Sequence, residues 1–226
     1  IRIINGRSIC PNCRRQLIWY ENIPVLSYLF LRGKCRTCRQ PIPYHFTFVE
    51  AGAALLFVFI AWKNLNDPAF TPAIFFRDIV FSVLLIIIFV YDLLYQEILP
   101  EVVWFGVLVG LGFNLYLGVS VWAMWWGALA AGGFFFLQYV ISQGKWIGGG
   151  DVRLGIMMGV WLGWPATLAA LFIAYLAGAI VGLFLLAVRK KTWASATPFG
   201  TYLAVGTFIT MLWGGRIIEW YLNLLK

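Results

Sequence analysis

Residues 82–91 read SVLLIIIFVY, ten positions without a charged side chain, and Asp92 follows directly. The whole chain is 62% hydrophobic and only 12% charged, with a mean hydropathy of +0.85. Soluble globular domains carry about 25% charged residues, whereas runs of this kind are typical of helices that cross a bilayer. The composition therefore excludes an ordinary soluble protein and predicts an all-α polytopic membrane protein.

Seven apolar segments follow one another from residue 46 onward. They cover 46–62, 78–95, 99–118, 122–141, 153–163, 166–188 and 199–219. We interpret them as about seven transmembrane helices, with the turn cluster NDPAFTP at 66–72 separating the first two. The fifth segment is short, and its Gly155, Gly159 and Gly163 share one helical face. Small residues at this spacing predict close packing against a neighbouring helix.

The first 45 residues differ from the rest because they are polar and carry eight basic side chains against one acid, Glu21. We divide the chain into a module at 1–45 and a transmembrane domain at 46–226. A basic block can bind nucleic acid, but beside a membrane domain the positive-inside rule explains it. We therefore predict a cytoplasmic module, no nucleic-acid partner, and a lipid bilayer whose anionic headgroups attract the arginines.

With the module in the cytoplasm, alternating crossings return the chain to the cytoplasmic side near Tyr95, near residue 142 and after residue 188. The basic cluster RKK at 189–191 follows the last of these points, as the positive-inside rule requires. Asp92 and Asp151 are separated by two crossings. We therefore expect both acids at the same face and at similar depth.

Most of the nine acidic residues have simple structural explanations; Asp78, for example, stands where an N-cap would begin a helix. Asp92 and Asp151 do not, because a carboxylate at membrane depth is costly and marks a functional site by default. Two neighbouring carboxylates share one proton. The ionised one can take a proton from water while the protonated one polarises a carbonyl. The pair therefore predicts an aspartyl protease.

Three consecutive glycines precede the second acid in the stretch WIGGGDVRLG at 146–155. Gly148, Gly149 and Gly150 lack side chains, so the backbone can approach a substrate and flex as a site closes. Taken alone, the glycines also fit a simple interhelical loop with Asp151 as a helix cap. The second acid across the helical hairpin favours the substrate-binding interpretation.

Two C-x2-C pairs, separated by twenty-one residues, contain all four cysteines of the chain, Cys10, Cys13, Cys35 and Cys38. Each pair offers two thiolates on one tight turn, and two such turns complete a tetrahedral site, which predicts a structural Zn²⁺. Two disulfides are the alternative, disfavoured by the reducing cytoplasm. Redox chemistry at the C-x2-C pairs is a third interpretation.

Around these residues the sequence resembles the GxGD-type intramembrane aspartyl proteases. The resemblance rests on YDLLYQEILPE at 91–101, GGGDVRLG at 148–155 and ATPFGTYLAVG at 196–206. The amino-terminal segments CPNC at 10–13, NIPVLSYLFLRGKCRTCRQPI at 22–42 and FVEAG at 48–52 are similar to one branch in particular, the type IV prepilin peptidases of bacteria.

The resemblance implies an enzyme of the bacterial inner membrane that removes a short basic leader from type IV prepilins or type II secretion pseudopilins at the cytoplasmic face. It implies Asp92 and Asp151 as the catalytic pair. Many members then methylate the new amino terminus with S-adenosylmethionine. The family has eight transmembrane segments, so we expect a further span ahead of Ile1.

Other residues take weaker roles from the same resemblance. Pro198, Phe199 and Gly200 belong to the third family stretch and are expected beside the site, in a substrate-binding or flexible loop. Glu50 matches a family position, to which we assign a role in methyl transfer or substrate binding.

Two other functions remain open from the sequence. One is a GxGD intramembrane protease with other substrates. The other is a proton-coupled transporter, which would place its acids near the bilayer midplane, often within internal repeats. The sequence leaves the particular pilin and the oligomeric state undetermined.

Overall fold

The computed structural model describes residues 8–68, 70–188 and 198–225. The chain divides into two compact units, Ile1–Asn66 and Asp67–Lys226. Within the described ranges the regular structure is helical, with two isolated β-bridges and no strand. The RKK cluster at 189–191 lies outside the described residues.

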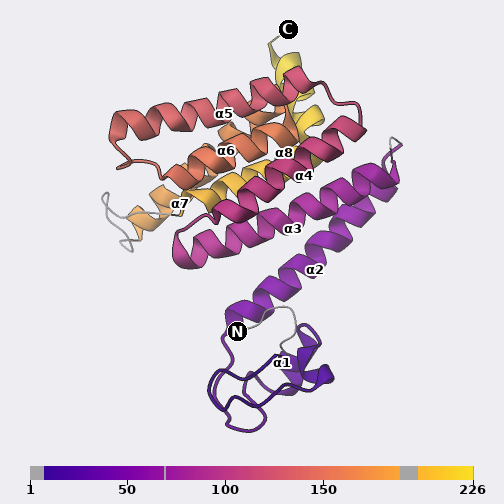
Figure 1. Cartoon of the computed structure of the whole chain (residues 1–226), viewed down its shortest axis with the longest axis vertical. Coiled ribbons are helices and arrows are strands. Elements are labelled where there is room, and N and C mark those ends of the chain that lie inside the picture. Colours follow the sequence, from indigo (N-terminus) through magenta and orange to yellow (C-terminus); the bar gives the residue numbers. More distant parts are fainter. Residues whose placement is uncertain (1–7, 69, 189–197, 226) are drawn as a thin grey trace. The chain divides into compact units, whose positions relative to one another are not determined.

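The first unit contains the 3-10 helix η1 (Trp19–Asn22), the short helix α1 (Leu26–Phe30) and the long helix α2 (Tyr44–Leu65) (Figure 1). The chain around the two short helices makes two tight turns. Antiparallel bridges close them, one between Ile9 and Gln16 and one between Lys34 and Pro41. These turns carry the four cysteines.

In its described residues, the second unit is a bundle of six helices. They are α3 (Pro72–Tyr95), α4 (Pro100–Tyr116), α5 (Val121–Ser142), α6 (Gly149–Leu162), α7 (Ala166–Ala187) and α8 (Phe199–Leu224). Each of the seven predicted apolar segments overlaps one of the helices α2 to α8. Five of these, α2, α3, α5, α7 and α8, are long and apolar enough to cross a membrane, whereas α4 and α6 have 17 and 14 residues. The polytopic membrane class is confirmed, and the number of crossings stays a prediction.

Helix α6 is the centre of the second unit and contacts α4, α5, α7 and α8 (Figure 1). Its predicted glycine face is confirmed for Gly155 and Gly159, whereas Gly163 is the C-cap after the helix, with a φ of 67°. A Cβ on Gly159 would collide with the backbone of α5 at Gly127 and Ala128, and one on Gly155 would lie 2.7 Å from the ring of Phe135. The absence of side chains at these positions lets α6 lie directly on α5.

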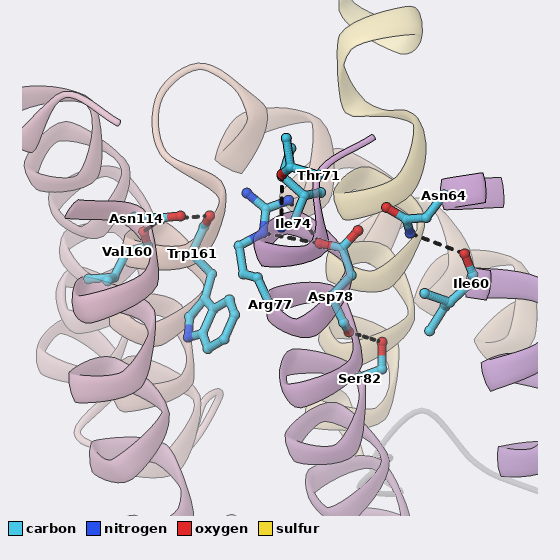
Figure 2. A network of polar contacts seen from close by, with 10 residues as sticks. All are labelled: Ile60, Asn64, Thr71, Ile74, Arg77, Asp78, Ser82, Asn114, Val160 and Trp161. Atoms are coloured by element: carbon cyan, nitrogen blue, oxygen red, sulfur yellow. Dashed lines mark hydrogen bonds and ion pairs between the residues drawn. The ribbon is translucent and has the colours of Figure 1, made fainter. Parts of the chain in front are cut away.

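The start of α3 differs from the sequence prediction. Asp78 does not begin a helix, because Thr71 is the N-cap, its hydroxyl accepts the N–H of Ile74 at 3.3 Å, and Pro72 opens the first turn. Asp78 instead lies inside α3, only 2% exposed, with its Oδ1 2.8 Å from Nη2 of Arg77 (Figure 2). A buried carboxylate needs such a partner, so this acid has a structural explanation of another kind.

The last turn of α6 is held by α4. The side-chain amide of Asn114 donates to the carbonyl oxygens of Val160 at 2.7 Å and Trp161 at 3.1 Å (Figure 2). The indole N–H of Trp161 donates to the carbonyl of Gly106 at 2.7 Å. The two bonds from Asn114 satisfy carbonyls of the last turn of α6, which have no partner inside their own helix. They anchor the short α6 at one end and so help to place Asp151 at the other.

Candidate active site

The connections α3–α4 and α5–α6 and the start of α8 surround a cleft of about 380 Å³ at one end of the second unit. Asp92 and Asp151 both line it. The expectation that two crossings bring these acids to the same end of the bundle is met within the described residues. The cleft is therefore the candidate active site.

Asp92 occupies the last turn of α3 and is 4% exposed. Its Oδ2 accepts the backbone N–H of Thr201 at 2.7 Å, in the first turn of α8. The amides of a helix's first turn have no partner inside the helix and attract negative charge. Asp92 therefore serves as an acceptor for α8 from a different helix, which fixes its carboxylate in position.

Asp151 is the third residue of α6 and is 8% exposed. Its Oδ2 accepts the N–H of Gly148 at 3.2 Å, so the carboxylate also caps its own helix. The side chain lies near enough to Asp92 for their charges to interact. The capping interpretation and the paired-carboxylate interpretation are therefore compatible.

The structure divides the predicted substrate-binding residues into two groups. Gly148, Gly150, Pro198 and Phe199 line the cleft. Gly149 is not among the lining residues; its carbonyl accepts the Nε–H of Arg153 at 3.1 Å. Gly200 is also outside the lining, but a Cβ there would lie 2.9 Å from Oδ2 of Asp92, so it contacts the site from behind.

Several site residues were not predicted from the sequence. Ile98 lines the cleft, and Thr201 donates to Asp92. The charged residues Glu97, Lys145 and Arg153 also line the cleft. Arg153 stands two residues after Asp151, a spacing that could have marked it. Ile98 and Thr201 lie within the family stretches at 91–101 and 196–206, but neither residue type indicates its role, because these roles come from contacts between distant segments.

The four cysteines form a second cluster, within the first unit. Their sulfur atoms all lie within 4.8 Å of one another, and the Sγ atoms of Cys10 and Cys38 are 3.8 Å apart. A tetrahedral ion with metal–sulfur bonds of about 2.3 Å would separate its ligands by about 3.8 Å. All four residues are free thiols, not disulfides. The cluster therefore has the donors and the spacing of a metal site.

The two C-x2-C turns have the same backbone geometry. The N–H of Cys10 donates to the carbonyl of Arg15, and the N–H of Cys35 donates to that of Gln40, both at 2.9 Å. Arg14 and Arg39 follow the second cysteine of each turn with positive φ angles of 54° and 55°. Two equivalent turns facing one centre are the arrangement that brings four sulfurs together.

The thiols of the cluster differ in pKa. Backbone N–H groups of Cys38 and Thr37 lower the pKa of Cys35 to about 6. The N–H of Arg15 lowers the pKa of Cys13, but burial and the hydrogen bonds with the other three cysteines outweigh it and raise that pKa to about 11. Four thiolates repel one another, so full ionisation of the cluster requires a cation.

Two acids of the first unit have structural partners. Glu21 accepts two hydrogen bonds from Nη2 of Arg15, at 2.8 and 2.9 Å, and the hydrogen bond from this guanidinium lowers the pKa of Glu21. Glu50 accepts the N–H of Val25 at 2.9 Å, which ties α2 to the turn before α1. Val25 has a φ of 62°, which is rare for a β-branched residue, so this turn depends on such support.

Comparison with known proteins agrees with the two-unit division. Residues 1–64 match the bacterial peptidase A24 N-terminal domain, and residues 79–183 match the type IV leader peptidase family. The second match includes both Asp92 and Asp151, and the first includes all four cysteines. The chain belongs to the type IV leader peptidase family. Relatives in this family match 96–99% of this chain.

Three of these relatives are named prepilin leader peptidase/N-methyltransferase. The protein of Pseudomonas putida is 33% identical over 224 residues, 96% of this chain and 76% of the relative. That of Aeromonas hydrophila is 35% identical over 218 residues, 96% and 75% of the two chains. That of Bacillus subtilis (strain 168) is 32% identical over 228 residues, 99% and 88%. No solved structure matches this chain.

Proposed function

We propose that this protein cleaves the leader peptide from type IV prepilins or type II secretion pseudopilins, with Asp92 and Asp151 as its catalytic pair. The observation that carries the proposal is the shared cleft: two buried aspartates from α3 and α6 line it together. Membership of the leader peptidase family supplies the substrate class.

In the proposed reaction, the ionised carboxylate takes a proton from a water molecule whose oxygen attacks the scissile carbonyl carbon. The protonated carboxyl donates its proton to the carbonyl oxygen, giving a neutral tetrahedral intermediate. When the C–N bond breaks, the protonated carboxyl gives its proton to the leaving nitrogen, and the other carboxylate takes a proton from a hydroxyl of the intermediate. The leader then departs with a new carboxyl group, and the pair again holds one proton. The Thr201 N–H donates to Asp92 and takes no part in the proton transfers, so it can keep this carboxylate oriented throughout the reaction.

The cleft also supports a specific way of binding substrate. Gly148 and Gly150 present bare backbone at its wall, and Pro198 and Phe199, at the start of α8, also line it. We propose that these residues and Gly149 and Gly200 hold an extended peptide. Glu97 is the cleft's exposed carboxylate next to the pair and suits a basic leader residue.

We place the protein in the bacterial inner membrane, with the cleft and the cysteine module on the cytoplasmic side. Exposed Arg14, Arg36 and Arg39 support that orientation through the positive-inside rule. The functional division then runs at residue 45, between a metal-binding module at 1–45 and a transmembrane protease domain at 46–226.

The cysteine cluster is proposed to hold a structural Zn²⁺, with all four sulfurs as ligands. Four sulfur ligands leave no open position for catalysis. For so small a module, metal binding supplies much of the folding free energy.

Methylation of the new amino terminus with S-adenosylmethionine is the second proposed activity, and the relatives' names support it. Glu50 remains our candidate for methyl transfer or substrate binding. Its carboxylate already accepts the Val25 N–H, so replacement by Gln tests whether a charge is needed beyond that hydrogen bond.

Cleavage of a prepilin by the full-length enzyme in lipid, followed by mass spectrometry, tests the proposal. Asp92→Asn and Asp151→Asn should each abolish the shortened product, because the two carboxylates act as a unit. Glu101→Gln is the matched control, since this exposed acid lies in the first turn of α4 but outside the cleft lining. The added mass of one methyl group, seen only with methyl donor, reports the second activity.

Persistent cleavage by both Asn variants would overturn the aspartyl mechanism. Proton-coupled transport would then be the leading function, and Asp151 would serve only as the cap of α6. Cleavage of unrelated membrane proteins but not of prepilins would instead keep the mechanism and overturn the substrate class.

A further inference from the structure

Ile98 contacts the backbone beside both candidate catalytic residues, at Gly150 and at Gly200. It lies in the short connection between α3 and α4, is 8% exposed, and belongs both to the hydrophobic core and to the cleft lining. It is an apolar residue, whereas the sequence analysis selects mainly charged and polar residues as candidates. Its importance is visible only from what it touches on either side.

On one side Ile98 packs against the first turn of α6. A Cβ on Gly150, the residue before Asp151, would lie 3.0 Å from Cβ of Ile98 and 3.4 Å from both its Cγ1 and Cδ1. All three nearest atoms belong to this one side chain. The isoleucine therefore rests on the bare backbone of α6 directly beside Asp151.

On the other side Ile98 packs against the first turn of α8. A Cβ on Gly200 would lie 2.9 Å from Cδ1 of Ile98 and 2.9 Å from Oδ2 of Asp92. The same turn donates the Thr201 N–H to Asp92. The methyl end of Ile98 therefore contacts the backbone that holds Asp92.

We propose that Ile98 is a positioning residue that sets the separation of the Asp92 and Asp151 carboxylates by spacing the first turns of α6 and α8. A β-branched side chain suits this task, because its χ1 angle is restricted and its shape is stiff. This inference rests on the proposed function, since the separation matters only if the two acids react together. Ile98 has no group that takes part in proton transfer, and it acts through the positions of the two aspartates.

Three substitutions change the shape of the Ile98 side chain. Ile98→Val deletes Cδ1, the atom next to Gly200; Ile98→Leu keeps the volume but moves the branch; Ile98→Ala removes all three carbons beyond Cβ. We expect kcat to fall about a hundredfold in the alanine variant and less in the valine variant, with KM little changed, because a displacement of about 1 Å costs that much. Ile88→Val is the matched control, a buried isoleucine of α3 outside the cleft lining.

A pair that has moved also titrates differently, whereas a merely destabilised protein does not. Carbon-13 NMR of labelled aspartate carboxyl groups follows the two titration steps of the pair without any substrate. The interval between them should change in Ile98→Ala and stay constant in Ile88→Val. Glu97, Lys145 and Arg153, the other charged groups that line the cleft among the described residues, are the same in both proteins.

A double variant tests the contact itself. Gly200→Ala adds a methyl group against Cδ1 of Ile98, and Ile98→Val removes that atom. The double variant should therefore be more active than the product of the two single effects.

Strictly multiplicative effects together with an unchanged titration interval would overturn the inference, as would a loss of kcat no greater than that of Ile88→Val. If the Asp92→Asn enzyme still cleaves, the proposed function fails instead. The titration interval then decides the role of Ile98 by itself.

Discussion

The backbone N–H of Thr201 lies 2.7 Å from Oδ2 of Asp92, although the two residues are 109 positions apart in the chain. The last turn of α3 thus ends against the first turn of α8, and one carboxylate serves both helices. Gly200 makes this approach possible, since any side chain there would contact Asp92. The geometry of the candidate site therefore depends on a residue that need not touch the substrate.

Gly200→Ala should reduce prepilin cleavage at least tenfold while the protein remains folded. The added Cβ would lie 2.9 Å from both Asp92 and Ile98, and small displacements of catalytic groups have large effects on rate. Gly215→Ala is the matched control, because a Cβ on this glycine of the same helix meets nothing within 4 Å. Equal cleavage rates for the two variants would contradict the proposed close contact.

Gly159→Ala should destabilise the bundle by about 1–3 kcal/mol, the usual cost of overpacking. Its Cβ would collide with the backbone of α5 at Gly127 and Ala128, which cannot yield as a flexible side chain does. Gly112→Ala adds the same methyl group to α4 in open space and should leave the free energy of unfolding unchanged or raise it slightly. Reversible unfolding in mixed micelles measures both, and a neutral Gly159→Ala would refute direct α5–α6 contact.

Removal of the metal should unfold the cysteine module. A strong zinc chelator, or replacement of Cys10 and Cys35 by serine, should abolish the protease resistance of residues 8–45, because the module is too small to rely on a core. The bound metal is measured by elemental analysis of the purified protein. A stoichiometry near zero, or an intact module in the serine variant, would argue against a structural zinc site.

The arginines of the module should differ in role, some binding the membrane surface and one stabilising the module. Arg14→Ser combined with Arg39→Ser removes two exposed charges and should weaken binding of the module to anionic vesicles, while leaving leader recognition largely intact. Arg15→Ser removes the partner of buried Glu21 and should chiefly destabilise the module. Vesicle flotation and thermal unfolding separate these effects. A larger loss of leader binding than of vesicle binding would reverse our assignment of the arginines.

The membrane class, the seven helical segments and the glycine face of α6 were all predictable, because each follows from local composition or periodicity. The start of α3 was harder to predict. Asp78 resembles a helix cap in the sequence, yet Thr71 and Pro72 begin the helix six residues earlier and leave Asp78 buried beside Arg77. A polar residue near a helix start fits several local roles, and burial decides among them.

By itself the sequence determined which elements form, since the hydrophobic effect and helix periodicity act over a few turns. It also predicted Asp92 and Asp151 at one end of the bundle, because the two apolar segments predicted between them return the chain to the same end. Only the tertiary structure decided how close they come and what holds them. The Thr201 N–H donates to Asp92, and the Ile98 side chain packs between Gly150 and Gly200. These contacts join segments far apart in the chain, and they form only when the helices pack together.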